Sequence, residues 1–270
     1  MRKILISVFV CFCGGVFGQG GYGSLILPGN TTCANEYINI SPCNGLTTLS
    51  YNGYSYDLVE IGGQCWFKEN LQTTKYRDGS PIDYPGSNNT TWENNTAGAY
   101  AWYNNDSTTY ASDYGALYSW NALVNPWGLC PVGWYVPTDC EWMYLEDTLG
   151  MSTPDQENTG FRGPDQGGKL KETGTAHWNS TSPDVTNSSG FTALAGGWRY
   201  ATGQFYNIGQ AGGWWSSSEL ITGKAYRILE DDKISVWRHH YAKTFGFSIR
   251  CIKDSSSAQS SLNNIEIIRP

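Results

Sequence analysis

The segment from Gly128 to Gly150 constrains the fold most, because it carries the clearest helix signal in the chain. Thr138 is followed three residues later by Glu141, the spacing of a capping box, in which each side chain accepts a hydrogen bond from the other residue's backbone amide. An apolar stripe and a terminal glycine follow, at Trp142, Leu145, Leu149 and Gly150. The pattern therefore predicts an amphipathic helix that starts after Thr138 and ends at Gly150.

The composition limits the class of protein. The chain has 270 residues, of which 40% are hydrophobic and 15% charged, enough for one large or two small globular domains. Its 32 Gly, 12 Trp and 18 Tyr favour short strands, tight turns and aromatic packing over long helices. A formal net charge of −7 argues against nucleic acid and anionic membranes as partners.

The first residues have the pattern of an export signal. The basic pair Arg2-Lys3 precedes an apolar run from Ile4 to Phe17, and Val16 and Gly18 are the small residues expected before cleavage at Gln19. Residues 1–18 are therefore predicted to be a signal peptide, which makes the protein secreted or displayed on the cell surface. A lipoprotein is the alternative, since two cysteines lie in the apolar run, but large residues precede both of them. No later segment has the apolar length that a transmembrane helix needs, so membrane insertion is not expected.

Six cysteines remain after the predicted signal: Cys33, Cys43, Cys65, Cys130, Cys140 and Cys251. An even number in an exported chain indicates disulfide bonds, and six cysteines allow 15 pairings. Free buried thiols or zinc ligands are the alternative. No Cys-x-x-Cys pair and no His-x₃₋₅-His partner supports a zinc site.

The chain is predicted to have four parts. The signal peptide is followed by an extension over 19–49, a folded domain over 50–254 and a serine-rich linker over 255–270. Within the domain, Tyr54–Ile61 and Gln64–Leu71 flank Gly62-Gly63, which predicts a tight hairpin. We also expect a polar surface insertion over 78–112, a short helix over 115–123 capped by Asp113, and loops over 152–166 and 177–189.

The last third alternates glycine-rich turns with short aromatic segments. Strands are predicted at Phe191–Leu194, Gly197–Tyr200, Gly213–Ser217, Ala225–Glu230 and Lys233–Arg238. A final strand over 245–252 has a largely apolar face that includes Cys251, so this cysteine is predicted to point into the core.

Several segments resemble a known family. Cys-Pro-x-Gly-Trp-x-x-Pro-Thr-x-x-Glu-Trp over 130–142 is similar to the signature of the Fibrobacter succinogenes major paralogous domain, found in secreted bacterial proteins. Further segments agree in order over roughly Ser50 to Asp254: Ile61–Gln64, Glu69–Leu71, Gly115–Trp120, Gly168–Glu172, His177-Trp178, Gly190-Phe191, Gly196-Gly197, Trp215–Ser218 and Gly246–Cys251.

The resemblance implies a fold and a set of disulfides. The core of that family resembles C-type-lectin-like folds, which implies an α+β domain with short, mostly antiparallel strands, two short helices and long loops. The same likeness implies a Cys130–Cys251 bond, with Cys33–Cys43 closing a local loop and Cys65–Cys140 remaining. Residues 264–270 resemble the opening strand of sorting domains recognised by type IX secretion; an accidental likeness is the alternative.

Catalysis has no positive support in the sequence. No Gly-x-Ser-x-Gly elbow, Walker loop, dinucleotide fingerprint or His-Glu-x-x-His motif occurs, and adjacent His239 and His240 would point to opposite faces of a strand. The enzyme alternative is a formylglycine-generating oxidase, through the resemblance of Pro137–Trp142. Its chemistry needs two reactive cysteines late in the chain, where only Cys251 lies, and Glu141 fits a capping role better than that of an acid. We therefore predict a protein that is not an enzyme.

No cofactor is predicted, with calcium as the one alternative. C-type lectins hold calcium with carboxylate and amide oxygens, and Glu230-Asp231-Asp232 supplies acidic oxygens. A solvated hairpin turn before Lys233 explains these residues better, because no Glu-Pro-Asn or Trp-Asn-Asp sugar-binding triplet is present.

The predicted binding residues are aromatic. Trp214 and Trp215 are adjacent on a predicted strand, so one indole should face the core and the other the surface, next to Ser216 and Ser217. Trp198, Trp178 and Tyr206 lie in neighbouring segments, although core packing is a common role for such residues. The sequence thus predicts a recognition module for carbohydrate or a cell-surface protein, with a purely structural surface component as the alternative.

Overall fold

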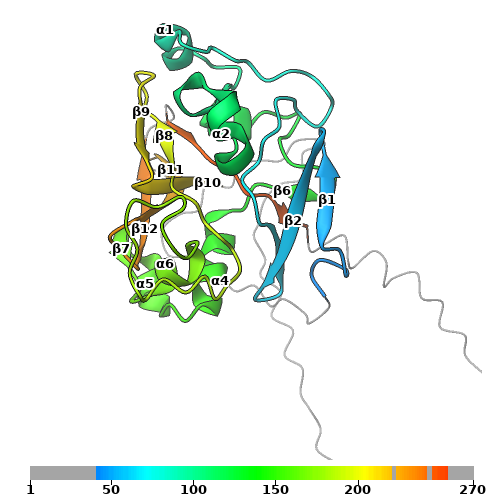
Figure 1. Ribbon diagram of the computed structural model, residues 1–270. Helices are drawn as coiled ribbons and strands as arrows, with labels where there is room; N and C mark the ends of the chain where they lie inside the picture. Colours follow the sequence, from blue (N-terminus) through cyan, green and yellow to red (C-terminus); the bar gives the residue numbers. More distant parts are fainter. Residues whose placement is uncertain (1–40, 221–222, 242–244, 255–270) are drawn as a thin grey trace, which may run out of the picture.

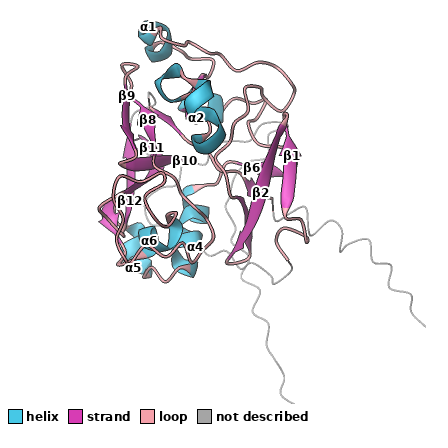
Figure 2. Cartoon of the chain, viewed as in Figure 1, coloured by secondary structure: helices cyan, strands magenta, loops and turns pink. Residues whose placement is uncertain are grey.

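The computed structural model describes residues 41–220, 223–241 and 245–254, which form two sheets and several short helices. Figure 1 shows the small sheet on one side of the molecule, the large sheet on the other, and helices above and below the large sheet. Strands outnumber helices throughout (Figure 2). The α+β character is confirmed. The predicted signal peptide, most of the extension and the linker over 255–270 lie outside the described residues.

The small sheet brings the two ends of the domain together. Its strands are antiparallel, in the order β1-β2-β3-β14-β6, with bounds Thr48–Tyr51, Tyr54–Ile61, Gln64–Phe67, Ile252–Lys253 and Trp134–Tyr135. The predicted hairpin is confirmed as β2 and β3. Gly62 turns at φ 59°, and a Cβ there would lie 2.1 Å from the Thr148 hydroxyl, so a glycine is needed for both reasons.

The large sheet carries the candidate site. Its order is β4-β5-β13-β8-β10-β11-β12-β7, with β9 paired to β8. The bounds are Tyr100–Ala101, Leu117–Ser119, Gly246–Phe247, Gly196–Arg199, Ala211–Leu220, Gly223–Glu230, Val236–Tyr241 and Gly160–Arg162, and β9 covers Phe205–Ile208. All pairs are antiparallel except β8 with β10.

The helices are short and more numerous than the two that we predicted. The described residues form α1 to α6 at Asn89–Glu93, Ser107–Tyr114, Trp120–Leu123, Asp139–Thr148, Thr153–Glu157 and Gln166–Leu170, with a 3₁₀ turn, η1, at Tyr103–Asn105. The predicted central helix is confirmed as α4, including the capping box between Thr138 and Glu141. Among the described residues, no helix is both long and apolar enough to span a membrane.

Several local predictions need correction. The segment 78–112 is no surface insertion, because it contributes Ile82, Trp92 and Tyr100 to the core and β4 to the sheet. The first half of the predicted helix over 115–123 is wrong, because α2 ends at Tyr114 and Leu117 lies on β5. The second half is confirmed as α3, in which Trp120 and Leu123 are buried. The predicted loop over 152–166 contains α5 and β7, whereas Phe191–Leu194 forms no strand beyond a single bridge. The final segment is buried on both sides, since Ser248 and Arg250 are as inaccessible as Cys251.

Two disulfides join cysteines of the described residues. Cys130–Cys251 is confirmed, across 121 residues, with Cys251 fully buried. The other predicted pairings are wrong, because Cys43 bonds to Cys65 on β3 and Cys140 is bonded elsewhere. Cys33 lies outside the described residues.

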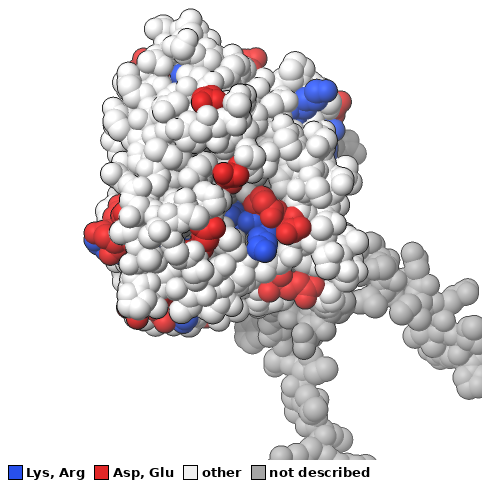
Figure 3. Space-filling view, viewed as in Figure 1, with Lys and Arg blue, Asp and Glu red and all other residues white. Residues whose placement is uncertain are grey.

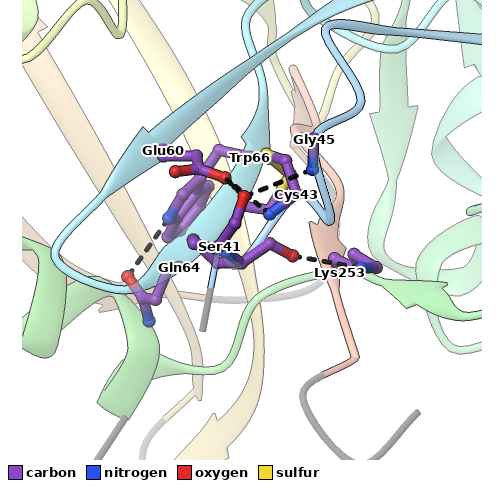
Figure 4. Close-up of a disulfide and its surroundings, with 9 residues drawn as sticks. Ser41, Cys43, Gly45, Glu60, Gln64, Trp66 and Lys253 are labelled. Carbon is purple, nitrogen blue, oxygen red and sulfur yellow. Dashed lines mark hydrogen bonds between the residues drawn. A yellow bond between two sulfur atoms is a disulfide. The ribbon is translucent and has the colours of Figure 1, made fainter. Parts of the chain in front are cut away.

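Hydrogen bonds explain why Cys43 lies beside the hairpin. The Glu60 carboxylate accepts from the Ser41 hydroxyl at 2.7 Å and from the Cys43 amide at 2.9 Å, and Lys253 donates to the Pro42 carbonyl at 3.1 Å (Figure 4). These contacts hold residues 41–43 against β2 and β14, which places the two sulfur atoms within bonding reach. Glu60 and Lys253 lie far from residues 41–43 in the sequence. Cysteine spacing alone could therefore not predict the Cys43–Cys65 bond.

Candidate functional site

The predicted tryptophan pair does not reach the surface. Trp214 is 1% exposed and Trp215 0%, so the expectation that one indole faces a ligand is wrong. The two rings do point to opposite faces of β10, but each face is covered. Trp214 packs with Trp142 and Phe191 in one core, and Trp215 with Trp120 and Phe247 in the other.

Both indole nitrogens are satisfied inside the protein. Trp214 donates to the Asn70 side-chain oxygen at 2.8 Å, and Trp215 donates to the Tyr118 carbonyl at 2.7 Å. Because buried indole N–H groups need such partners, these bonds fix β10 against the rest of the domain. The pair is structural, and neither ring offers a face to a ligand.

The neighbouring serines also have structural roles. Ser216 is fully buried, its hydroxyl accepting from the Ser218 amide at 3.1 Å. The Ser217 amide donates to the Pro137 carbonyl at 2.7 Å, and the Ser218 hydroxyl accepts from the Asp139 amide at 2.9 Å. These contacts anchor the start of α4 on β10.

The exposed aromatic surface lies instead at the β8–β9 hairpin. Trp198, Tyr200, Tyr206 and Asn207 line an open hollow of about 240 Å³, which we call the hairpin hollow. Tyr206 is 47% exposed and Tyr200 37%, with ring centroids 6.1 Å apart and ring planes perpendicular. The perpendicular arrangement places two differently oriented aromatic surfaces at one opening, beside the Asn207 amide. Such a mixture of flat apolar surface and amide groups suits a ligand that has both apolar C–H faces and hydroxyl groups.

The hairpin alternation explains why these rings share one side. Trp198 lies opposite Tyr206 in the strand pairing, and side chains opposite each other project from the same face. The intervening Arg199 lies opposite Phe205 and points to the other face, which α1 and η1 cover. One face of the hairpin is therefore packed, and the other is partly open, since Trp198 also packs on Phe247 there.

Arg199 holds the covered face together. It is fully buried, and its guanidinium donates to the Gly203 carbonyl at 3.0 Å, the Gly86 carbonyl at 2.9 Å and the Asn89 side chain at 3.2 Å. Its Cζ lies 4.4 Å from the Trp92 ring centroid, and the Trp92 indole donates to the Tyr200 carbonyl at 3.1 Å. Burial lowers the pKa of Arg199 to about 10. No carboxylate among the described residues pairs with it, and one terminal nitrogen has no partner.

A second buried charge cluster lies between α4 and the large sheet, and we call it the α4 ion cluster. Arg227 contacts Asp139 at 2.6 Å and Glu146 at 2.7 Å, Arg162 contacts Glu146 at 2.8 Å, and Arg238 contacts Asp139 at 2.5 Å. Burial alone would raise the pKa of Asp139, but Arg227 and Arg238 hold that pKa well below its usual range. Each charged group of the cluster contacts an opposite charge and most of the cluster is buried, which indicates a structural role.

The acidic turn proposed for calcium holds a lysine. The Lys171 ammonium lies 2.7 Å from the carbonyls of Glu230 and Lys233 and 3.3 Å from that of Asp231. Its Nζ is also 5.0 Å from the Trp178 ring centroid. Three backbone carbonyls of this turn thus bind an internal cation, the Lys171 ammonium, and are not open to a calcium ion. Within the described ranges, no group of His, Cys, Asp and Glu side chains is arranged to hold a metal ion.

The remaining chemical candidates have internal partners as well. Cys251 is in a disulfide, so it has no free thiolate for oxidase chemistry. The Glu141 carboxylate is bound by Tyr135 and Thr138, as the cap requires, and burial raises its pKa. His177 contacts Glu172 at 2.8 Å and lies 3.7 Å from Asp113, and His239 bonds the His240 carbonyl.

Comparison with known proteins identifies the family. The model of the Fibrobacter succinogenes major domain matches residues 59–253, most of the chain. The fold and the site define the protein as a sheet-rich α+β domain with disulfides and an exposed aromatic hollow. The chain belongs to the Fibrobacter succinogenes major domain family. We found no match among curated proteins and none among solved structures.

The sequence identified part of the hairpin hollow and missed the rest. Trp198 and Tyr206 were among the predicted aromatic residues, and both line it. Tyr200 and Asn207 were missed. The glycine-rich run Tyr200-Ala-Thr-Gly-Gln between aromatic segments was the available signal, because it predicts a hairpin whose flanking residues share a face.

Proposed function

We propose that this protein is an exported, non-catalytic recognition module that binds carbohydrate at the hairpin hollow. One observation carries the proposal: Trp198, Tyr200 and Tyr206 converge on an open hollow with an amide beside them. An aromatic face covers the apolar C–H groups of a sugar ring, while amide and hydroxyl groups bond its hydroxyls. The well-packed opposite face supports this role, since it directs the binding residues toward the open side.

The cellular setting is part of the proposal. Disulfides persist in oxidising compartments, which agrees with a protein outside the cytoplasm. The amino-terminal pattern adds a signal peptide, and the carboxyl-terminal likeness adds type IX secretion as the export route. A C-type-lectin-like arrangement of the domain would fit the same role, with Lys171 in place of a calcium ion at the 230–233 turn.

The test is a glycan array probed with the purified protein, with and without a calcium chelator. We expect saturable binding to a subset of glycans that the chelator leaves unchanged. Tyr206→Ala should weaken binding about tenfold, because it removes one stacking face from an exposed position. Trp127→Ala is the matched control, since Trp127 is 56% exposed on a different part of the chain. Absence of binding to any glycan, or equal binding by Tyr206→Ala, would contradict the proposal.

A further inference from the structure

The hairpin hollow is one end of a longer row of aromatic side chains. Beyond Tyr200 the row continues through Phe245, Tyr241, His239, Trp237 and Phe161, and we call these five residues the aromatic track. The Phe245 ring lies 4.9 Å from Tyr200 and 5.5 Å from Tyr241. Ring contacts do not pass directly from Tyr241 to His239. Instead the buried rings of Phe247 and Tyr226 link Phe245 to His239, with centroid distances of 5.3, 4.9 and 6.1 Å along the way.

Strand geometry gives the track its direction. Trp237, His239 and Tyr241 are alternate residues of β12, so all three project from one face of the sheet. Each lies about 6.6 Å along the strand from the next, since a strand rises about 3.3 Å per residue. Trp237 and His239 are stacked, with ring centroids 5.9 Å apart and planes 11° apart. Phe161 on the edge strand β7 lies opposite Trp237, with ring centroids 4.8 Å apart. Figure 1 shows β9 high and β12 and β7 low on the same flank of the molecule, with β8, β10 and β11 between them.

Two residues of the track are open to solvent. Tyr241 is 48% exposed and Phe161 38%. With Tyr200 and Tyr206 in the hollow, these are four of the large apolar side chains that the described surface leaves exposed. Phe245, His239 and Trp237 are half-buried, and Phe245 and Trp237 also pack against the core, so the track is a row of partly exposed rings. Such rings gathered along one sheet face mark an interaction surface.

The charges nearby are already paired or turned away. Arg238, between Trp237 and His239, projects from the opposite face and bonds Asp139. Lys224 pairs with Glu219, and Lys233, beside Phe161, pairs with Asp232. In Figure 3 the left edge of the molecule is white at the level of β8 and β9, and a group of charged atoms lies lower on that edge, near the level of β7. A row of rings without free charge favours a neutral ligand over an anionic one.

We propose that the hollow and the aromatic track together bind an extended, neutral polysaccharide strand. This inference rests on the proposed function and goes beyond it, because it names the ligand as a linear polymer rather than a terminal sugar. A β-1,4-linked glucan is suited to the track, since it is straight, uncharged and has an apolar C–H face on each ring. The strand lies along the sheet face, with successive sugar rings over successive aromatic side chains.

The experiment compares short and long probes by isothermal titration calorimetry, using cellobiose and cellohexaose, with pull-down on insoluble cellulose. We expect the hexasaccharide to bind at least about tenfold more tightly than the disaccharide, because it covers more aromatic rings. Phe161→Ala and Tyr241→Ala should each reduce hexasaccharide affinity about fivefold and reduce the ratio of the two affinities. Trp127→Ala should keep the wild-type ratio, and thermal unfolding confirms that each variant folds.

The outcomes separate this inference from the proposed function. Equal affinity for both probes would overturn the polymer assignment and leave a site for a short glycan. A hexasaccharide affinity unchanged in both track variants would overturn the track. Binding of glycans on the array but of neither glucan would also overturn the assignment, whereas a failure to bind any glycan would overturn the proposed function itself. Capture of a protein partner by the intact track, lost in Phe161→Ala, would replace the polysaccharide with a protein ligand.

Discussion

Arg227 and Arg199 are both completely buried, but their charges are neutralised in different ways. Arg227 lies in the α4 ion cluster, where carboxylates of Asp139 and Glu146 contact it directly. Arg199 lies under the β8–β9 hairpin with carbonyl oxygens and aromatic rings around it and no carboxylate partner among the described residues. Burial lowers the pKa of Arg199 to about 10, whereas Glu146 and Asp139 more than offset burial and raise the pKa of Arg227.

The difference shows how the two regions are built. The α4 ion cluster consists of direct charge pairs between regular elements, so removal of one charge leaves another buried and unpaired. The Arg199 site depends on carbonyls from the loops at Gly86 and Gly203, which can rehydrate when the arginine is lost. We infer that α4 forms the fixed part of the domain, and that the hairpin with its open aromatic face is the more adjustable part.

The largest loss of stability is expected from Glu146→Gln, which removes one negative charge from the α4 ion cluster. Glu146 is 0% exposed and pairs with both Arg162 and Arg227. Without that charge Arg162 loses its carboxylate partner, and Arg227 keeps only Asp139, which it shares with Arg238. Breaking a buried pair costs about 3–5 kcal/mol. Chemical denaturation should show this loss in the free energy of unfolding. Glu157→Gln on α5 is the control, since Glu157 is exposed, and it should unfold like the wild type.

A smaller loss is expected from Arg199→Met, which removes the unpaired charge but keeps an unbranched apolar chain between Trp92 and Phe205. The carbonyls lose their donor, so the free energy of unfolding should fall by about 1–3 kcal/mol. Arg199→Lys is compared with it, because lysine keeps the charge but lacks the planar guanidinium that reaches the carbonyls of Gly86 and Gly203. A lysine variant clearly more stable than the methionine variant would show that the charge itself stabilises the hairpin.

The same contrast explains which features the sequence predicted. The β2–β3 hairpin and α4 were predicted because their signals are local: two glycines between strand residues, and a capping box before an apolar stripe. The predicted site failed at Trp214 and Trp215, where strand alternation was right but coverage of both sheet faces depends on residues far away in sequence. The contact of the Lys171 ammonium with the carbonyls of the 230–233 turn is also long-range, because it joins residues 59 to 62 positions apart in the sequence.

The disulfides show the same limit. Cys130–Cys251 was predicted from the family resemblance, whereas Cys43–Cys65 depends on how Glu60 and Lys253 hold residues 41–43. In the hollow, Trp198 and Tyr206 were found by residue type alone. Their pairing across the hairpin, and their contact with Tyr200, needed the strand register.

The smallest effect is expected from Thr138→Ala, at the cap of α4. The Thr138 hydroxyl accepts from the Glu141 amide at 3.3 Å, and the Glu141 carboxylate accepts from the Thr138 amide at 2.6 Å. Loss of the hydroxyl should lower the free energy of unfolding by about 0.5–2 kcal/mol. Because Ser218, the Cys140 disulfide and the ion pairs of Asp139 still hold α4, the helix should remain in place. Glycan affinity at the hairpin hollow should therefore equal that of the wild type in titrations well below the unfolding temperature. An affinity that falls together with stability would show that α4 and the hairpin form one cooperative unit, and the division into a fixed and an adjustable part would be wrong.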